Sequence, residues 1–193
     1  MNKGLFVITM LATLFFTSCS EFNNIIKSGE YLYRYEAAKQ YYADGKYTRA
    51  VVLLQDVISV LKGTDKGEES LYLLGISAYK ARDYEAAANF LKKYYETYTN
   101  GLYTQDARFY NAMALYKNTP EPKLDQTETY EAVTAFQNLL EIFPQSIYAK
   151  ESQDMIFKLQ DKLVEKEYLS AKTYFDLGSY FGNCNFGGNN YQA

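Results

Sequence analysis

Residues Tyr72–Tyr94 read YLLGISAYKARDYEAAANFLKKY, and this stretch decides the fold. Its first half repeats large residues every three or four positions around Gly75, which is the periodicity of an amphipathic helix. A polar turn at Arg82-Asp83 interrupts the pattern, and a second helical pattern follows from Tyr84. Two helices joined by so short a link must pack antiparallel. The stretch therefore predicts a helical hairpin.

The hairpin pattern recurs along the chain at a fixed period. Two ladders of aromatic residues keep a spacing of 37 residues: Tyr35, Tyr72 and Phe109, and then Tyr42, Tyr79 and Tyr116. A period of this length is typical of stacked helix pairs. The pattern predicts helices over 31–43, 47–61, 68–81, 84–98, 104–117, 131–142 and 147–178, the last being one bent helix or two. The predicted fold class is all-α, a right-handed solenoid of helix pairs forming one domain over 31–193.

The last helix pair is expected to be incomplete. The pattern restarts at Tyr168 and reaches Tyr180, after which a glycine- and asparagine-rich stretch, FGNCNFGGNN, occupies residues 181–190. The sequence then stops at Ala193, where a second helix of the pair would begin. We interpret the chain either as truncated at its C-terminus or as a product whose last helix needs another protein.

Composition weighs against chemistry and against nucleic acid. The chain has no histidine, the commonest general base, and no serine or cysteine can therefore be activated by one. Its formal net charge of −3 disfavours binding to phosphate backbones. Asp154 and Asp161, seven apart, could form an acid–base pair or a Ca²⁺ site, but a solvated helix face is the favoured interpretation. We expect no enzyme activity, no metal and no cofactor.

The N-terminus is predicted to be an export signal. Lys3 precedes an apolar run of 12 residues, Leu5–Phe16, which is too short to span a bilayer and suits a signal-peptide core. Ser18-Cys19 resembles the lipobox of bacterial lipoproteins, which implies cleavage of residues 1–18 and acylation of Cys19. The alternative is an ordinary signal peptide with an incidental cysteine. Residues 19–30 are then a lipidated tether. Cys184, the other cysteine, is either inert or available for intermolecular pairing.

The repeats resemble the tetratricopeptide repeat. Leu74-Gly75, Asp83-Tyr84 and Ala87 form the best copy, and Pro144 matches its closing proline. Small residues at these sites allow close helix packing. Together with the lipobox, the proline-rich stretch Pro120–Gln126 and FQNLLEIFPQSIYA at 136–149 resemble one family in particular. This family is BamD, the outer-membrane lipoprotein of the β-barrel assembly machinery.

The resemblance to BamD implies an outer-membrane-anchored scaffold on the periplasmic face. It implies contact with a barrel-inserting BamA-type subunit through the C-terminal repeats, and a groove in the N-terminal repeats for unfolded outer-membrane proteins. The lipid on Cys19 would hold the chain at the membrane. The runner-up hypothesis is a periplasmic repeat-adaptor lipoprotein that serves envelope maintenance or cell division.

The aromatic ladders are the candidate groove for a partner or peptide. Residues seven apart on a helix share one face, so each first helix carries an aromatic stripe. The resemblance places these stripes on the inner wall of the repeats. Burial in the core is the competing interpretation; we favour the groove because small residues already supply a packing face. The predicted groove residues are Tyr35, Lys39, Tyr42, Tyr72, Ile76, Tyr79, Phe109, Met113 and Tyr116.

Overall fold

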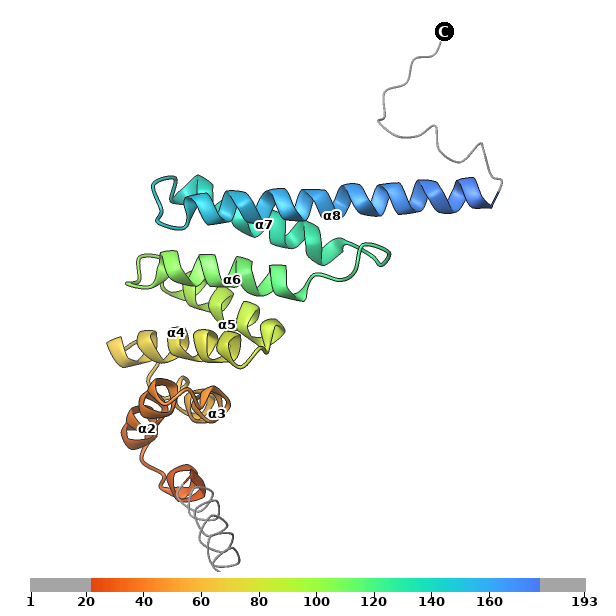
Figure 1. Cartoon of the computed structure of the whole chain (residues 1–193). Helices are drawn as coiled ribbons and strands as arrows, with labels where there is room; N and C mark the ends of the chain where they lie inside the picture. The colour runs from red at the N-terminus through yellow and green to blue at the C-terminus, as the bar shows by residue number, and fades with distance from the viewer. Residues whose placement is uncertain (1–21, 178–193) are drawn as a thin grey trace, which may run out of the picture. The chain divides into compact units, whose positions relative to one another are not determined.

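The computed structural model describes residues 22–177, and every regular element among them is a helix (Figure 1). From residue 31 onward the helices are α2 (Tyr31–Ala43), α3 (Tyr47–Val57), α4 (Asp65–Lys80), α5 (Tyr84–Thr97), α6 (Thr104–Asn118), α7 (Thr127–Ile142) and α8 (Ala149–Asp176). Helices α2 and α3, α4 and α5, and α7 and α8 pack together as hairpins. The predicted fold class, all-α with tetratricopeptide-like helix pairs, is confirmed.

The chain divides into two compact units, the first ending at Thr104 and the second beginning at Gln105. In the first unit, α2 packs on α3, α3 on α4, and α4 on α5. In the second unit, α7 packs on α8, and Phe109 of α6 lies against Phe136 of α7 with ring centroids 6.4 Å apart. The sequence predicted one domain over 31–193. Spacing could not reveal the division because the 37-residue period continues across it.

Small residues lie at the buried helix crossings, as the repeat pattern predicts. The following alanines are fully buried: Ala38, Ala50, Ala87, Ala112 and Ala132. Gly75 of α4 faces α5 so closely that a Cβ atom there would stand 2.6 Å from Cγ of Leu91. A larger side chain would therefore push these two helices apart.

The two hairpin turns of the first unit have the same backbone geometry. Gly45 and Arg82, one period apart, both adopt a left-handed conformation, with φ of 73° and 66°. In each turn the following N–H donates to the carbonyl five residues earlier, at 2.8 and 3.0 Å. This is the Schellman way of ending a helix. Asp83 then caps α5 by accepting from the N–H of Ala86 (3.2 Å).

The segment before α2 differs from the expected tether. Residues 22–27 are helical, and Ile25 is buried in the apolar core that α2 and α3 share. Phe22 meets Tyr41 edge-to-face with ring centroids 5.5 Å apart, and the Arg34 guanidinium donates to the carbonyl of Ile26. Within the predicted tether, residues 19–30, the segment 22–27 is thus helical and packed on the repeats, because its apolar side chains recur at helical spacing and find a core to pack on.

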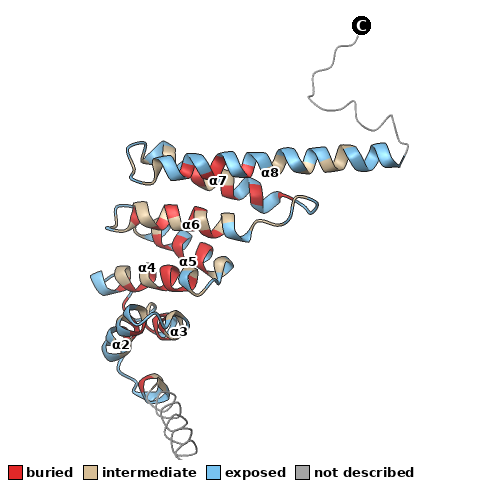
Figure 2. Cartoon of the chain, viewed as in Figure 1, coloured by how far each residue is buried: buried red, intermediate tan, exposed pale blue. Residues whose placement is uncertain are grey.

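Helix α8 is one continuous helix of 28 residues rather than two. Its buried residues, Ser152, Met155, Ile156 and Leu159, all lie in its first half (Figure 2). Three other predicted boundaries shift by three or four residues, and one of them is the start of α4, which is Asp65 instead of residue 68. Helix α3 ends at Val57 instead of residue 61, and α7 begins at Thr127 instead of residue 131.

Candidate partner-binding surfaces

The first aromatic ladder lies at the junctions between successive repeats. Tyr35 is 1% exposed, Phe109 is 3% exposed and Ile76 is 3% exposed. The groove prediction is wrong for these three residues. Tyr35 and Phe109 are buried because residues at the start of the next first helix, Lys66 and Tyr148, lie against their rings.

Each aromatic residue of the first ladder, Tyr35, Tyr72 and Phe109, is covered by a residue at or just before the start of the next first helix. Tyr103 stacks on Tyr72 with ring centroids 4.2 Å apart and an interplanar angle of 5°. In the second unit, Tyr148 stacks on Phe109 at 4.1 Å and 7°. In the first repeat the ammonium of Lys66 lies 4.7 Å from the ring centroid of Tyr35. Stacked and cation–π contacts of this kind each contribute about 0.5–1.5 kcal/mol beyond area burial.

Sequence reasoning missed these covering residues, although a signal for two of them existed. Tyr103 stands one position before α6, and Tyr148 stands one position before α8. An aromatic residue immediately before a first helix was therefore the available signal. Tyr103 and Tyr148 lie 45 residues apart and not 37, because the connection between α6 and α7 (119–126) is longer than the one between α4 and α5 (81–83), and so the two residues were not visible as a ladder.

The second aromatic ladder keeps part of its surface exposed. Tyr42 meets Tyr47 and Tyr79 meets Tyr84, in both cases edge-to-face with ring centroids 5.6 Å apart. These pairs sit at the hairpin corners, one period apart. The groove residues that are only partly buried are Lys39, Tyr42, Tyr72 and Tyr79 in the first unit, and Met113 and Tyr116 in the second. They remain candidates for contact with a partner.

A charged cluster joins α2 to α4 beside the first ladder. The Lys39 ammonium lies 2.9 Å from Oε1 of Glu69, and the Tyr35 hydroxyl donates to the same carboxylate. Burial, followed by the hydrogen bond to Glu69, raises the pKa of Tyr35 to about 12. Burial also acts to raise the pKa of Glu69, but the hydrogen bonds from Tyr35 and Lys39 lower it overall. At neutral pH the carboxylate is ionised and the hydroxyl protonated, so the cluster holds charge and does not transfer protons.

The far half of α8 is a second candidate surface. Among its apolar residues, Val164, Tyr168 and Phe175 are 68%, 65% and 67% exposed. Figure 2 shows this end of the helix exposed around most of its circumference. A run of large exposed apolar side chains on one helix is typical of a surface that contacts another chain.

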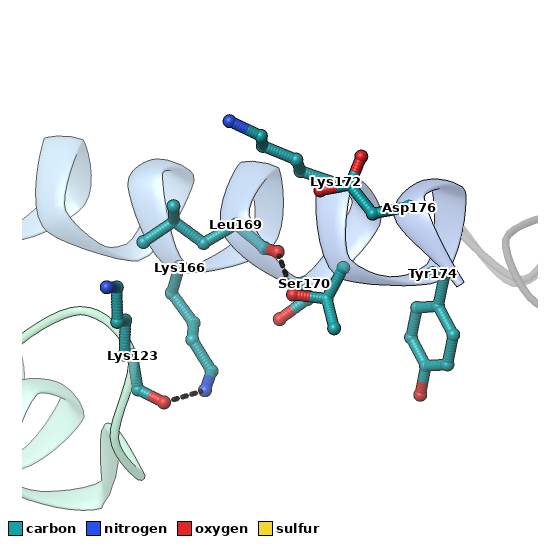
Figure 3. A pocket seen from close by; sticks show the side chains of 8 residues that line it. Lys123, Lys166, Leu169, Ser170, Lys172, Tyr174 and Asp176 are labelled. Atoms are coloured by element: carbon teal, nitrogen blue, oxygen red, sulfur yellow. Dashed lines mark hydrogen bonds between the residues drawn. The ribbon is translucent and has the colours of Figure 1, made fainter.

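Two lysines of α8 hold the connection between α6 and α7. The Lys162 ammonium donates to Oγ1 of Thr119 (2.7 Å) and to the carbonyl of Pro120 (3.1 Å). One turn later, Lys166 donates to the carbonyl of Lys123 at 2.9 Å (Figure 3). This proline-containing connection is thus held against α8 as an ordered part of the second unit.

An open pocket lies beyond this connection, lined on α8 by Lys166, Ser170, Thr173 and Tyr174 (Figure 3). Lys172 points to the opposite side of the helix from Tyr174 in this view. The pocket is shallow and its lining is mixed in charge, so it offers no arrangement of groups suited to catalysis.

The residues considered for metal or acid–base chemistry do not converge. Asp154 and Asp161 are both exposed on α8, as a solvated face requires. Within residues 22–177, no three cysteine or acidic side chains gather as potential metal ligands.

The predicted anchor lies outside the described residues, and so do Cys184 and the FGNCNFGGNN stretch. None of the helices between residues 22 and 177 combines the length and the apolar character needed to cross a bilayer.

Paired helices with small residues at their crossings and aromatic junctions between repeats define a helical-repeat protein of the tetratricopeptide type, a class that binds other chains through its surfaces. Within that class, residues 30–185 match the model of the family described as outer membrane lipoprotein (YfiO), and the chain belongs to this family.

Curated relatives agree with the family. A putative outer membrane protein assembly factor BamD of Aquifex aeolicus is 26% identical over 171 residues, which cover 88% of this chain and 56% of that protein. The BamD of Neisseria gonorrhoeae is 26% identical over 165 residues, covering 78% of this chain and 60% of the relative. The BamD of Caulobacter vibrioides is 21% identical over 134 residues, covering 69% and 44%. The chain thus spans less than two thirds of the length of these relatives.

Proposed function

We propose that the chain is an outer-membrane-anchored scaffold that takes part in assembling outer-membrane proteins from the periplasmic side. The observation that carries this proposal is the family match over residues 30–185, because it covers nearly all of the described helical repeats. The relatives are named as outer membrane protein assembly factors, which supports the same role here. In this role the chain acts by contact and not as an enzyme. The lipid on Cys19 is its only attached group.

The scaffold would hold two kinds of protein, a partner subunit and unfolded substrates. We assign contact with a barrel-inserting BamA-type subunit to the second unit, where the far half of α8 exposes apolar side chains. Unfolded outer-membrane proteins, which are rich in aromatic residues, would be held weakly at the partly exposed tyrosines of the first unit. A few aromatic anchors usually dominate such interfaces.

Isolation of the complex tests the role. A tagged full-length chain is expressed in its own host, membranes are solubilised in mild detergent, and the co-purified proteins are identified by mass spectrometry. Recovery of an outer-membrane barrel-inserting subunit at near-stoichiometric amounts is expected. Recovery of peptidoglycan-linked partners alone would overturn the proposal in favour of an envelope-maintenance adaptor.

Substitution of corner tyrosines tests substrate holding. Tyr42→Ala combined with Tyr79→Ala removes two partly exposed rings and leaves the stacked junction at Tyr72 in place. Binding of a fluorescent aromatic-rich peptide is expected to weaken about tenfold, while helicity by circular dichroism stays unchanged. The matched control is Tyr33→Ala with Tyr130→Ala, which removes two exposed rings outside the ladders. Equal loss of peptide binding in both variants would contradict a specific surface.

A further inference from the structure

A pocket of about 250 Å³ lies between the end of α3, the start of α4 and the end of α5 in the first unit. Its apolar wall consists of Ile58, which follows α3, Leu71 in α4, and Tyr98, which follows α5. Leu71 is buried and the other two side chains are half-buried, whereas Lys62 and Lys93, which also line the pocket, are exposed. An apolar interior with a charged rim is the arrangement found at the centre of many protein interfaces.

The wall of this pocket is held in place by contacts behind it. The carbonyl of Tyr98 accepts a hydrogen bond from Oγ1 of Thr104 (2.8 Å), and the ring of Tyr98 lies 5.5 Å from that of Tyr94, which is fully buried. Where α4 begins, Thr64 caps the helix by accepting from the N–H of Gly67 at 3.1 Å. Because these groups are already ordered, a ligand would lose little free energy in fixing them.

The positive charge at the rim is not compensated within the described part of the chain. Among residues 22–177, neither Lys62 nor Lys93 has a carboxylate within 4 Å of its ammonium, and no acidic residue lines the pocket. Glu96, the next acidic residue along α5, lies 4.0 Å from the ammonium of Lys92 instead. The two ammonium groups are therefore available to carboxylates from outside the chain.

The equivalent positions of the first repeat carry an ion pair. One period of 37 residues before Leu71 and Lys93 stand Arg34 and Asp56, whose guanidinium and carboxylate lie 3.5 Å apart. In the second repeat a leucine thus replaces the cation and a lysine replaces the anion. Both members of the pair have changed, so the second repeat has an apolar wall and a cation without its carboxylate at this place.

The size of the pocket indicates what it holds. Its volume is below the range of about 300–1,000 Å³ that is usual for sites of whole small molecules, and it suits a single large side chain. The two exposed lysines at the rim then select acidic residues on either side of that side chain. The pocket lies at the ends of the helices away from the hairpin corners with Tyr42 and Tyr79, so it is separate from the surface proposed for unfolded substrates.

We propose that this pocket binds an acidic segment of another protein, which inserts one large apolar side chain between Ile58, Leu71 and Tyr98 and places carboxylates against Lys62 and Lys93. This goes beyond the scaffold role and does not depend on it. One apolar anchor and two solvent-exposed ion pairs give weak binding, with Kd on the order of 10–100 µM.

Short peptides test the proposal. They are blocked at both ends, and phenylalanine, leucine or tryptophan stands between two pairs of aspartates. Isothermal titration calorimetry with the mature chain, in its Cys19→Ala form so that no lipid is present, is expected to detect binding of at least one of them. Replacing its central residue by alanine, or its aspartates by asparagines, should weaken binding at least about tenfold. If none of the three peptides binds with Kd below about 1 mM, or if the asparagine peptide binds equally well, the proposal is overturned.

Reversal of the rim charges locates the site. Lys62→Glu with Lys93→Glu is expected to abolish binding of the aspartate peptide and to allow binding of a peptide with lysines in place of the aspartates. The matched control, Lys92→Glu with Lys150→Glu, makes the same change in net charge at exposed positions that do not line the pocket, and it should leave binding nearly unchanged. Equal weakening by both double variants would show that only net charge matters, and it would overturn the assigned site.

Filling the pocket gives a second readout. Leu71→Arg with Lys93→Asp introduces into the second repeat the ion pair that Arg34 and Asp56 form in the first. This variant is expected to lose peptide binding and to keep its helicity by circular dichroism. Unchanged binding in the folded variant would place the peptide elsewhere and overturn the proposal. If the variant does not fold, the charge reversal at the exposed lysines decides the question.

Discussion

At the scale of single residues, Phe109 shows how the aromatic ladder stabilises the repeats. Its ring is 3% exposed, stacks on Tyr148 at 4.1 Å and meets Phe136 edge-to-face at 6.4 Å. One side chain thus connects α6, α7 and the start of α8. A residue in this position contributes to stability, whereas a groove residue would contribute mainly to binding.

Phe109→Ala is therefore expected to lower the free energy of unfolding by about 3–5 kcal/mol, because it leaves a buried cavity and an unstacked ring. Urea denaturation followed by circular dichroism measures the change. The control Ile147→Ala removes an apolar side chain that is 82% exposed, and it should change stability by no more than about 0.5 kcal/mol. If Phe109→Ala changed the free energy of unfolding only slightly but abolished peptide binding, Phe109 would be a groove residue after all.

Tyr148, which covers Phe109, makes stability depend on pH in the alkaline range. Burial, then the negative charge of Asp106 and the 3.1 Å hydrogen bond to it, raise the pKa of Tyr148 to about 12. The pKa of tyrosine in the unfolded chain is about 10. Because the folded-state pKa is the higher one, this stabilisation is fully present below pH 10 and is lost as the pH rises from about 10 to about 12.

The urea midpoint is accordingly expected to fall between pH 9 and pH 11.5, and to fall less steeply in Tyr148→Phe. Tyr168→Phe, at an exposed tyrosine of the same unit, serves as the control and should keep the wild-type slope. Identical slopes for wild type and Tyr148→Phe would show that the hydroxyl has no part in the pH dependence.

At the scale of elements, the two hairpin turns of the first unit show that the chain tolerates a non-glycine residue, Arg82, in a left-handed backbone conformation. The left-handed position that ends α2 is Gly45, but the equivalent position after α4 is Arg82, with φ of 66°. For a residue with a Cβ atom this conformation costs about 1–2 kcal/mol. The backbone hydrogen bonds that end α4, from Arg82 to Tyr79 and from Asp83 to Ala78, nevertheless hold Arg82 in this conformation.

Arg82→Gly should consequently stabilise the first unit by about 0.5–1 kcal/mol, the relief of strain being partly offset by the greater freedom of glycine in the unfolded chain. Thermal and urea unfolding measure this gain. Arg82→Ala separates strain from the loss of the arginine side chain, since alanine keeps the Cβ atom, and it should bring no gain. Destabilisation by Arg82→Gly would mean that the side chain, not the backbone, matters at this turn.

At the scale of the whole molecule, the chain combines two compact repeat units with a predicted lipid anchor at Cys19. Family membership supports an attachment to the outer membrane. Acylation at Cys19, predicted from the sequence, would connect the repeats to the membrane.

Cys19→Ala is expected to move the chain from the membrane fraction to the soluble fraction of the cell, and to abolish labelling with palmitate. Cell fractionation with immunoblotting and metabolic labelling measure the two effects. Cys184→Ala is the matched control, because it removes the other cysteine and should change neither result. Continued palmitate labelling of Cys19→Ala would place the lipid elsewhere.

Local rules explain why much of the fold was predictable. The boundaries of α2 were predicted without error and those of α5 and α6 to within one residue, because caps, turns and helical spacing act over a few positions. The small residues at helix crossings, such as Gly75, were predictable for the same reason. The helix over 22–27 was not, since so short an element is stable only through the core that Ile25 enters.

The sequence by itself determined that this chain is an all-α repeat protein of the BamD-like lipoprotein family, and which residues repeat. Only the tertiary structure decided what the repeating aromatics do. Spacing places Tyr35 and Phe109 on one face of their helices, but it cannot show that the segment entering the next repeat covers that face.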